Sequence, residues 1–431
     1  MEHHKTTTAA LVAAIISFTF LFTAVPLADI ADADDPAGVF YFSADGSEWA
    51  AHTNVYTDLQ TAINDASAWS ASNANEQAFV LVAVGTYTLG FIELQNGVTV
   101  RGGFDGTEAG LIPTYQQDGD PAGLTNTVFI PSTSGINISD SGNGTPTLDN
   151  VVITGATSSA ISFYRAANVV NCTITGCTSG MVIIYLSSGL GTIKFLNCSI
   201  VGNTASGLIS ATGSIAFISC TIQNNTVGLA NIIVSSTSNS TFLNCTIISN
   251  TSTSCGGIYS MGYATLINTI VALNTPTTQT QTVAGGTLIA QSSVIGDQIY
   301  SADGLTHDTL SPAPDAADFD IDGSLMETAT WAIGQGDVLL YMEHMDTALI
   351  TLNPALGTSW TAETMRDMRD NPIITGDPGD QIIDLGAFST GIDPEELEPD
   401  PTPNIFGVPW WVILSVVALA ILGIFLIIKE D

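Results

Sequence analysis

The sequence predicts an all-β solenoid, and three observations lead to this fold class. A ten-residue motif, written FLNCTIISNT at 242–251, recurs with spacings of 21 to 26 residues. Its fixed positions hold Asn, Cys, Thr and Ile without a 3.6-residue period, which argues against the helical leg of a leucine-rich repeat. Gly, Ser, Thr and Asn are abundant, and charged residues make up only 11% of the chain. Short strands separated by turns fit a right-handed parallel β-helix of about nine or ten coils.

The first 33 residues have the form of a secretory signal peptide. An apolar stretch covers residues 9–25 after Lys5, and the Ala-Asp-Ala sequence at 31–33 has the small-x-small form of a signal-peptidase site. We therefore expect the mature protein to begin near Asp34. The alternative is an uncleaved membrane anchor at this end of the chain.

The repeats occupy residues 94–300, and equivalent side chains should stack about 4.8 Å apart along the axis. With alternate residues pointing inward, positions four and six of the motif share the core. Position one is always apolar and position two is apolar in most copies, so we expect a bend or bulge between them. The copies begin at residues 148, 169, 195, 217, 242 and 266, with weaker copies at 94, 124 and 289, and position six holds Ile153, Ile174, Ile200, Ile222, Ile247 and Val271.

Two polar columns run through the repeats. An Asn at a corner can bond its local backbone and the amide of the next Asn, so position nine predicts a structural ladder. The Cys side chains of position four run parallel to one another, which is poor disulfide geometry, and we expect buried free thiols there. Cys177 and Cys255 are better candidates for a bridge. The ladder residues are Asn203, Asn225, Asn250 and Asn274, and the column residues are Cys172, Cys198, Cys220 and Cys245.

The end of the chain predicts a membrane anchor. An acidic closing region at 301–390 and an acidic, Pro-rich linker at 391–408 precede residues 409–428, which contain no charge. Twenty such residues are long enough to cross about 30 Å of hydrocarbon as a helix. Trp410 and Trp411 fit an interfacial aromatic belt, and Lys429 begins a short cytoplasmic tail at 429–431. We expect a single-pass protein of the cell membrane with its N-terminal domain outside the cell.

Segments on both sides of the repeats resemble a known family. The stretch LQTAINDASAWSASNANEQAFVLVAVGTYTL, followed by GGFDGTE, precedes the repeats, and DMRDNPIITGDPGDQIIDLGAF follows them. They resemble the opening and closing segments of right-handed parallel β-helix cell-surface proteins of the polymorphic outer-membrane and adhesin-like group, which end in a D-x-GA-aromatic signature and a variable C-terminal anchor. The resemblance covers roughly residues 39–390 and implies an N-terminal cap helix at about 59–69, within a cap and first strands at 34–93. Ser389 departs from the Glu that is usual in that group.

Charge and composition limit the functions open to the chain. The net charge of −34 makes a nucleic-acid partner very unfavourable. Parallel β-helices also serve as polysaccharide lyases and glycoside hydrolases of pectate-lyase-like fold, which need carboxylates, metal ligands or a basic residue in a groove. Residues 151–296 contain no Asp, Glu or His, and their only charges are Arg165 and Lys194. We therefore expect a non-catalytic surface-structural or adhesive role, with carbohydrate or other surface proteins as partners, and keep the lyase or hydrolase as the alternative.

Three kinds of candidate ligand site remain. Asp318, Asp320 and Asp322 open a weak Ca²⁺ loop, because Ala329 stands where the last acidic ligand belongs, and the alternative is a solvated acidic loop. No catalytic residue and no other cofactor are predicted. The glycosylation candidates are Asn137, Asn143 and Asn239. Tyr164, Tyr185, Tyr259 and Tyr263 could form a shallow sugar-stacking surface, or could simply pack against their neighbours.

Overall fold

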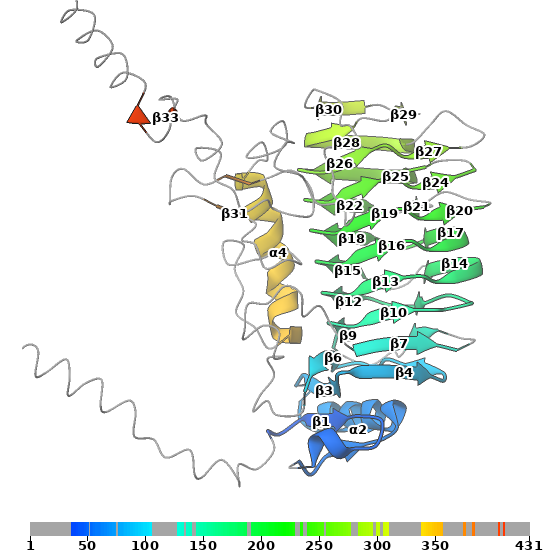
Figure 1. The fold of residues 1–431 in the computed structure, drawn as a ribbon, viewed down its shortest axis with the longest axis vertical. Helices are drawn as coiled ribbons and strands as arrows, with labels where there is room; N and C mark the ends of the chain where they lie inside the picture. The colour runs from blue at the N-terminus through cyan, green and yellow to red at the C-terminus, as the bar shows by residue number, and fades with distance from the viewer. Residues whose placement is uncertain are drawn as a thin grey trace, which may run out of the picture.

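In the computed structural model, one continuous stack of parallel strands makes up most of the chain (Figure 1). The structure describes residues 36–105, 127–309 and 338–356, with short gaps inside the first two ranges, and four two-residue strands further on. Every pairing described within the stack is parallel. Each turn of the chain contributes strands to three walls, which surround the core.

Parallel register holds each wall together from coil to coil. The first wall contains β1 (Val39–Phe42), β3 (Ala78–Ala83), β6 (Val98–Phe104), β9 (Thr147–Asp149), β12 (Ala167–Val170), β15 (Ile193–Leu196), β18 (Ile215–Ile218), β22 (Ser240–Leu243), the second half of β25 (Ile258–Ile267), the middle of β28 (Val283–Ile295) and β30 (Leu305–Thr309). The second wall contains β4 (Gly85–Leu89), β7 (Thr127–Pro131), β10 (Val152–Thr154), β13 (Thr173–Thr175), β16 (Ser199–Val201), β19 (Thr221–Gln223), β23 (Thr246–Ile248), β26 (Ile270–Ala272) and the end of β28.

The third wall carries the candidate functional site. It contains β5 (Ile92–Glu93), β8 (Ile136–Ile138), β11 (Ile161–Phe163), β14 (Thr178–Leu186), β17 (Thr204–Ala211), β21 (Ile233–Ser235), the starts of β25 and β28, and β29 (Ile299–Ser301). The first halves of β14 and β17 pair with each other, and three short strands continue this pairing in the later coils: β20 (Thr226–Val227), β24 (Thr251–Ser252) and β27 (Thr275–Pro276).

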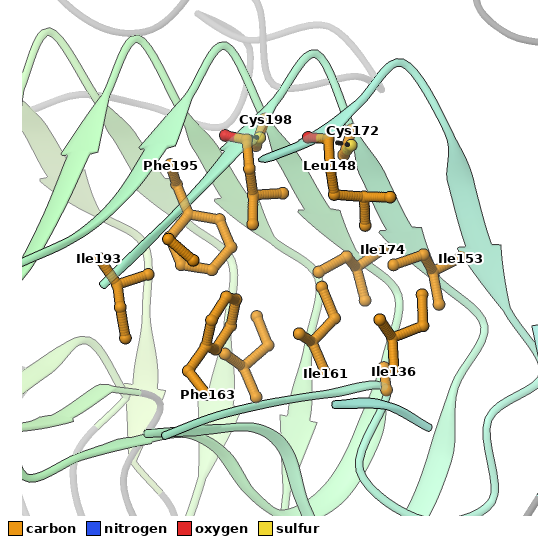
Figure 2. Close-up of a cluster of buried hydrophobic side chains, with 14 of the residues drawn as sticks. Ile136, Leu148, Ile153, Ile161, Phe163, Cys172, Ile174, Ile193, Phe195 and Cys198 are labelled. Carbon is orange, nitrogen blue, oxygen red and sulfur yellow. Dashed lines mark hydrogen bonds between the residues drawn. The ribbon is translucent and has the colours of Figure 1, made fainter. Parts of the chain in front are cut away.

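The core lies between the walls and is apolar throughout (Figure 2). Position six of the motif points inward from the second wall, as Ile153 and Ile174 show in the close-up. Position one also points inward, and Phe195, Phe217 and Phe242 stack in successive coils with centroid separations of 4.9 and 5.3 Å. Stacked rings of equal shape fill equivalent space in each coil, so the repeat preserves close packing.

The predicted bend between positions one and two is wrong. Simple alternation holds, so that position one faces the core and position two faces outward. Position two is apolar because helix α4 (Val338–Leu356) packs against it, and Figure 1 shows this helix running along the side of the stack. The outward row is Val170, Leu196, Ile218, Leu243 and Ile267, and the helix contributes Tyr341, Met345, Ala348 and Leu349 to the same buried cluster.

The chain bends at position three instead, where the first wall turns into the second. Residues at this position adopt left-handed backbone conformations, with φ between 50° and 55° from Asn150 to Asn268. Asn tolerates this conformation better than most residues, because its short polar side chain bonds nearby groups. The residue at position three, which is Asn in five of these copies and Ser219 in the sixth, therefore makes the corner.

A second helix, α2 (Leu59–Ser72), lies beside the first strands at the N-terminal end of the stack (Figure 1). The Asp58 side chain caps it by accepting the backbone N–H of Thr61 at 2.8 Å. Its apolar face, which includes Leu59 and Ile63, joins the main core. Short elements before it are η1 (Ser47–Trp49) and β2 (Val55–Tyr56), which pairs with β1.

Several predicted segments lie outside the described residues. These are the signal peptide at 1–33, most of the closing region and linker, and the apolar segment at 409–428 except for its first residue. In the part of the chain that the structure describes, no helix has the length and apolar character needed to cross a membrane. Beyond α4, the described pieces are the antiparallel pairs β31 (Ile374–Thr375) with β32 (Ile382–Ile383) and β33 (Asn404–Ile405) with β34 (Val408–Pro409).

Candidate functional site

Six residues that carry hydroxyl groups occupy outward positions of the third wall in two rows, where Ser162 is buried and the other five are at least partly exposed. Ile161, Phe163 and their counterparts in the next two coils belong to the core, so the residues between and after them face outward. Parallel register places Ser162 beside Tyr185 and Tyr185 beside Ser210. The Ser187 N–H donates to the Phe163 carbonyl at 2.9 Å, and the Thr212 N–H donates to the Leu186 carbonyl at 3.1 Å. These bonds place Ser187 beside Tyr164 and Thr212 beside Ser187, which forms the second row. We call this surface the hydroxyl grid: Ser162, Tyr164, Tyr185, Ser187, Ser210 and Thr212.

Two aromatic rings dominate the hydroxyl grid. Tyr164 is 47% exposed, and Tyr185 is half-buried beside it. Their ring centroids are 6.2 Å apart and their planes meet at 63°, an edge-to-face arrangement that aromatic pairs favour. The rings therefore form a corner on the wall, with Tyr164 as its more exposed side.

The hydroxyl grid contains no charged side chain. Its first row continues toward the N-terminus through Asn137 to Glu93, whose carboxylate accepts a hydrogen bond from the Ser139 hydroxyl. Arg165 follows Tyr164, and its Nη2 donates to the Gly144 carbonyl at 3.0 Å. Hydroxyl groups both donate and accept hydrogen bonds, so this neutral surface suits a polyol ligand.

The four tyrosines that the sequence singles out do not form one surface. Tyr164 and Tyr185 are brought together, and Tyr259 lies in the same row as Tyr185, separated from it by Ser210 and the next coil. Tyr263 is 54% exposed but follows a register shift in β25, where the strand enters the first wall. Sequence spacing alone did not reveal the serine and threonine neighbours of the pair.

The position-nine Asn residues bond consecutive coils to one another. Each Oδ1 accepts the backbone N–H of position nine in the preceding coil at 3.0 to 3.1 Å. Each Nδ2 donates to the position-six carbonyl of the preceding coil at 2.8 to 2.9 Å. Between Asn203 and Asn274, the Nδ2 groups also donate to the next Asn Oδ1 at 2.9 to 3.0 Å. The sequence predicted that each Asn would bond its own local backbone. The structure shows instead that the backbone partners belong to the neighbouring coil.

The position-four thiols also make hydrogen bonds. Each Sγ donates to the carbonyl two residues earlier at 3.1 to 3.3 Å. Cys220 Sγ additionally accepts the N–H of Cys198 at 3.4 Å, and Thr269 takes the same role for the N–H of Cys245 at 3.3 Å. Cys172, Cys198, Cys220 and Cys245 are all buried and free. A Cys or Thr side chain at position four can therefore form hydrogen bonds with backbone groups beside the corner, which an aliphatic side chain cannot do.

The remaining candidates are placed as follows. Cys177 is at position nine, and its thiol is free and buried. Its backbone N–H donates to Asn203 Oδ1. Asn137 is partly buried on β8, and Asn239 is exposed just before β22. Among the described residues, no group of three or more His, Cys, Asp and Glu could hold a metal ion. Asn143, Cys255, Asp318, Asp320 and Asp322 lie outside those residues.

One buried charged pair was not predicted from the sequence. Arg101 Nε lies 2.5 Å from Asp149 Oδ2, and both side chains are buried. Asp149 Oδ1 also accepts from Asn171 Nδ2 at 3.1 Å, and the guanidinium lies 5.8 Å from the Phe79 ring centroid. These are outward positions of the first wall, equivalent to the apolar row under α4. The signal was present, because Arg101 is one of only seven basic residues in the chain.

Comparison with known proteins supports the fold. Residues 115–276 match the family model described as a right handed beta helix region. The matched region covers about seven turns, whereas the predicted nine or ten coils also include the weaker copies on either side. No curated protein and no solved structure matches the chain. The parallel stack and the family match over residues 115–276 together support a right-handed β-helix fold for the repeats.

Proposed function

We propose that the protein is an extracellular, membrane-anchored β-helix that contacts saccharides through the hydroxyl grid without cleaving them. The observation that carries this proposal is the grid itself, six neutral hydroxyl-bearing residues with an exposed Tyr164 ring. The apolar segment at 409–428 serves as the anchor and the acidic linker as a spacer. Helix α2 covers the open edge of the first coil, which would otherwise pair with other strands.

Rigidity supports a contact role. The stacked Phe rings and the Asn ladder hold the third wall in place, so little conformational entropy is lost when a ligand binds. A shallow surface binds each saccharide weakly. Many copies anchored in one membrane convert weak single contacts into strong attachment, because later contacts form at high effective concentration.

A polysaccharide lyase or glycoside hydrolase of pectate-lyase-like fold is the alternative. Such enzymes place carboxylates or a basic residue beside the sugar bond. The repeats at 151–296 contain no carboxylate to serve the hydroxyl grid. Asp149 is buried against Arg101, and Glu93 lies three coils away from Tyr185 in the same row. These placements favour contact over cleavage.

The test exposes the full-length protein in detergent to a panel of neutral and acidic polysaccharides. Retention on the panel measures binding, and mass spectrometry of the recovered sugars measures cleavage. We expect retention of at least one neutral polysaccharide, recovered at its original length. Unsaturated or shortened products would favour the enzyme, and a protein that binds no member of the panel would contradict the contact proposal.

A further inference from the structure

We infer that the hydroxyl grid is a subsite for one neutral sugar ring, which stacks on Tyr164 and is hydrogen-bonded by the surrounding hydroxyls. This inference rests on the proposed saccharide contact and assigns it a position, a ligand class and separate roles for the two tyrosines. Sugar rings have an apolar C–H face and a rim of hydroxyl groups. A site for them therefore needs an exposed aromatic face beside neutral donors and acceptors.

Tyr164 supplies the stacking face. It is the more exposed of the two rings, whereas Tyr185 is half-buried against the wall. The 63° angle between the planes prevents a single ring from lying flat on both tyrosines at once. A sugar that stacks on Tyr164 therefore meets Tyr185 at its rim, where the phenolic hydroxyl can bond a sugar hydroxyl.

The spacing of the hydroxyl grid fits one ring. Neighbouring coils are about 4.8 Å apart, and residues two apart on one strand are separated by about 6.6 Å. Ser187 and Ser210 therefore flank the tyrosine corner within reach of a single six-membered ring. Since these residues come from backbone held by parallel register, the hydroxyls are positioned before the ligand arrives.

Charge favours an uncharged sugar. The chain carries a net charge of −34, which repels anionic polymers at long range. Neither row of the hydroxyl grid contains a cation. Arg165 lies next to Tyr164 in sequence, so a preference for acidic sugars through its guanidinium is the outcome that would contradict this part of the inference.

The experiment is a calorimetric or fluorescence titration of the full-length protein with a neutral oligosaccharide that the panel retains. Tyr164→Ala should weaken binding about tenfold, because the stacking face is lost, whereas Tyr164→Phe should stay within about twofold of the original affinity. Tyr185→Phe should cost about fivefold, the effect of one neutral hydrogen bond. Tyr263→Ala is the matched control, since this exposed tyrosine lies outside the hydroxyl grid, and it should leave affinity unchanged.

The outcomes separate the two proposals. If the original protein binds the sugar and Tyr164→Ala behaves like Tyr263→Ala, the subsite lies elsewhere and this inference is overturned while the saccharide contact stands. If the original protein binds no sugar, the proposed function itself fails. Tighter binding of the uronic-acid counterpart, lost in Arg165→Gln, would overturn the neutral ligand class. Thermal unfolding of each variant verifies that the stack is intact.

Discussion

At position nine, a single Asn side chain uses its whole hydrogen-bonding capacity between coils. Asn225 Nδ2 donates to the Ile200 carbonyl and to Asn250 Oδ1, each at 2.9 Å. Its Oδ1 accepts from the backbone N–H and the Nδ2 of Asn203, each at 3.0 Å. No other small side chain offers two donors and two acceptors in this arrangement, so the same residue recurs where the geometry recurs.

Replacing Asn225 with Ala tests the ladder. The change leaves the N–H of Asn203 and the carbonyl of Ile200 buried without these partners, at about 1–3 kcal/mol for each group. We expect the midpoint of urea unfolding, followed by circular dichroism, to fall clearly. Asn239→Ala is the control because that side chain is exposed outside the ladder. Equal midpoints for the two variants would show that the ladder adds no stability.

The position-four thiols allow a second test at this scale. Burial raises the pKa of Cys172, Cys198 and Cys245, so the reactive thiolate is scarcer at pH 8 than for an exposed cysteine. We expect iodoacetamide to leave these residues unmodified in the native protein and to label them after unfolding in urea. Peptide mass spectrometry measures this site by site. Rapid native labelling of Cys172 would contradict a closed core.

Among the elements, α4 explains a feature that the repeats alone do not, the apolar residues at position two. It covers the outward row of the first wall, and the Thr99 hydroxyl donates to the Ala355 carbonyl at 2.5 Å near its end. The apolar character of position two therefore reflects a partner that lies far away in sequence. Burial of this row contributes about 25 cal/mol per Å² of apolar surface, as any core does.

Two adjacent residues of α4 provide a matched pair. Leu349 is 3% exposed within the interface, whereas the next residue, Ile350, is 73% exposed. Leu349→Asp would bury a charge without a partner, so we expect the helix to detach and its amides at 338–356 to exchange hydrogen faster. Ile350→Asp should leave exchange unchanged. Hydrogen–deuterium exchange with mass spectrometry measures both, and equal protection in the two variants would rule out the packing of α4 described above.

The core could be predicted because the same residues recur locally, whereas packing between distant parts of the sequence could not be predicted. The Ile column and the position-nine Asn residues could be identified because the same residues recur at similar spacing. Position two was misread because its partner, α4, follows the repeats, although apolar residues at 341, 345, 348 and 349 have helical spacing. The Asn at position three was itself a turn signal, since its left-handed conformation is one that Asn favours.

The outer coils and the candidate site were harder to predict for physical reasons. The weak copy placed at 94 is out of register, because the structure pairs Val100 with Leu148. The hydroxyl grid draws on segments of unequal length, and β14 and β17 shift register between Ser179 and Val182. Such an irregularity changes which residues face outward, so alignment of the motif does not extend across the third wall.

In the whole molecule, the walls have different roles. The first wall carries α4, the core and Asn ladder fix the stack, and the third wall presents the hydroxyl grid. Stability in such a stack comes from each coil and its interface with the next, so a rigid, chemically simple surface can be built without charged groups. The proposed contact function depends on that surface meeting a sugar without any acid or base beside it.

The most direct measurement is a crystal structure of the full chain bound to a neutral oligosaccharide that it retains. We predict electron density for an unbroken sugar chain on the third wall, with one ring lying over Tyr164. A sugar bound in a cleft lined by carboxylates, or found there in cleaved form, would contradict this prediction.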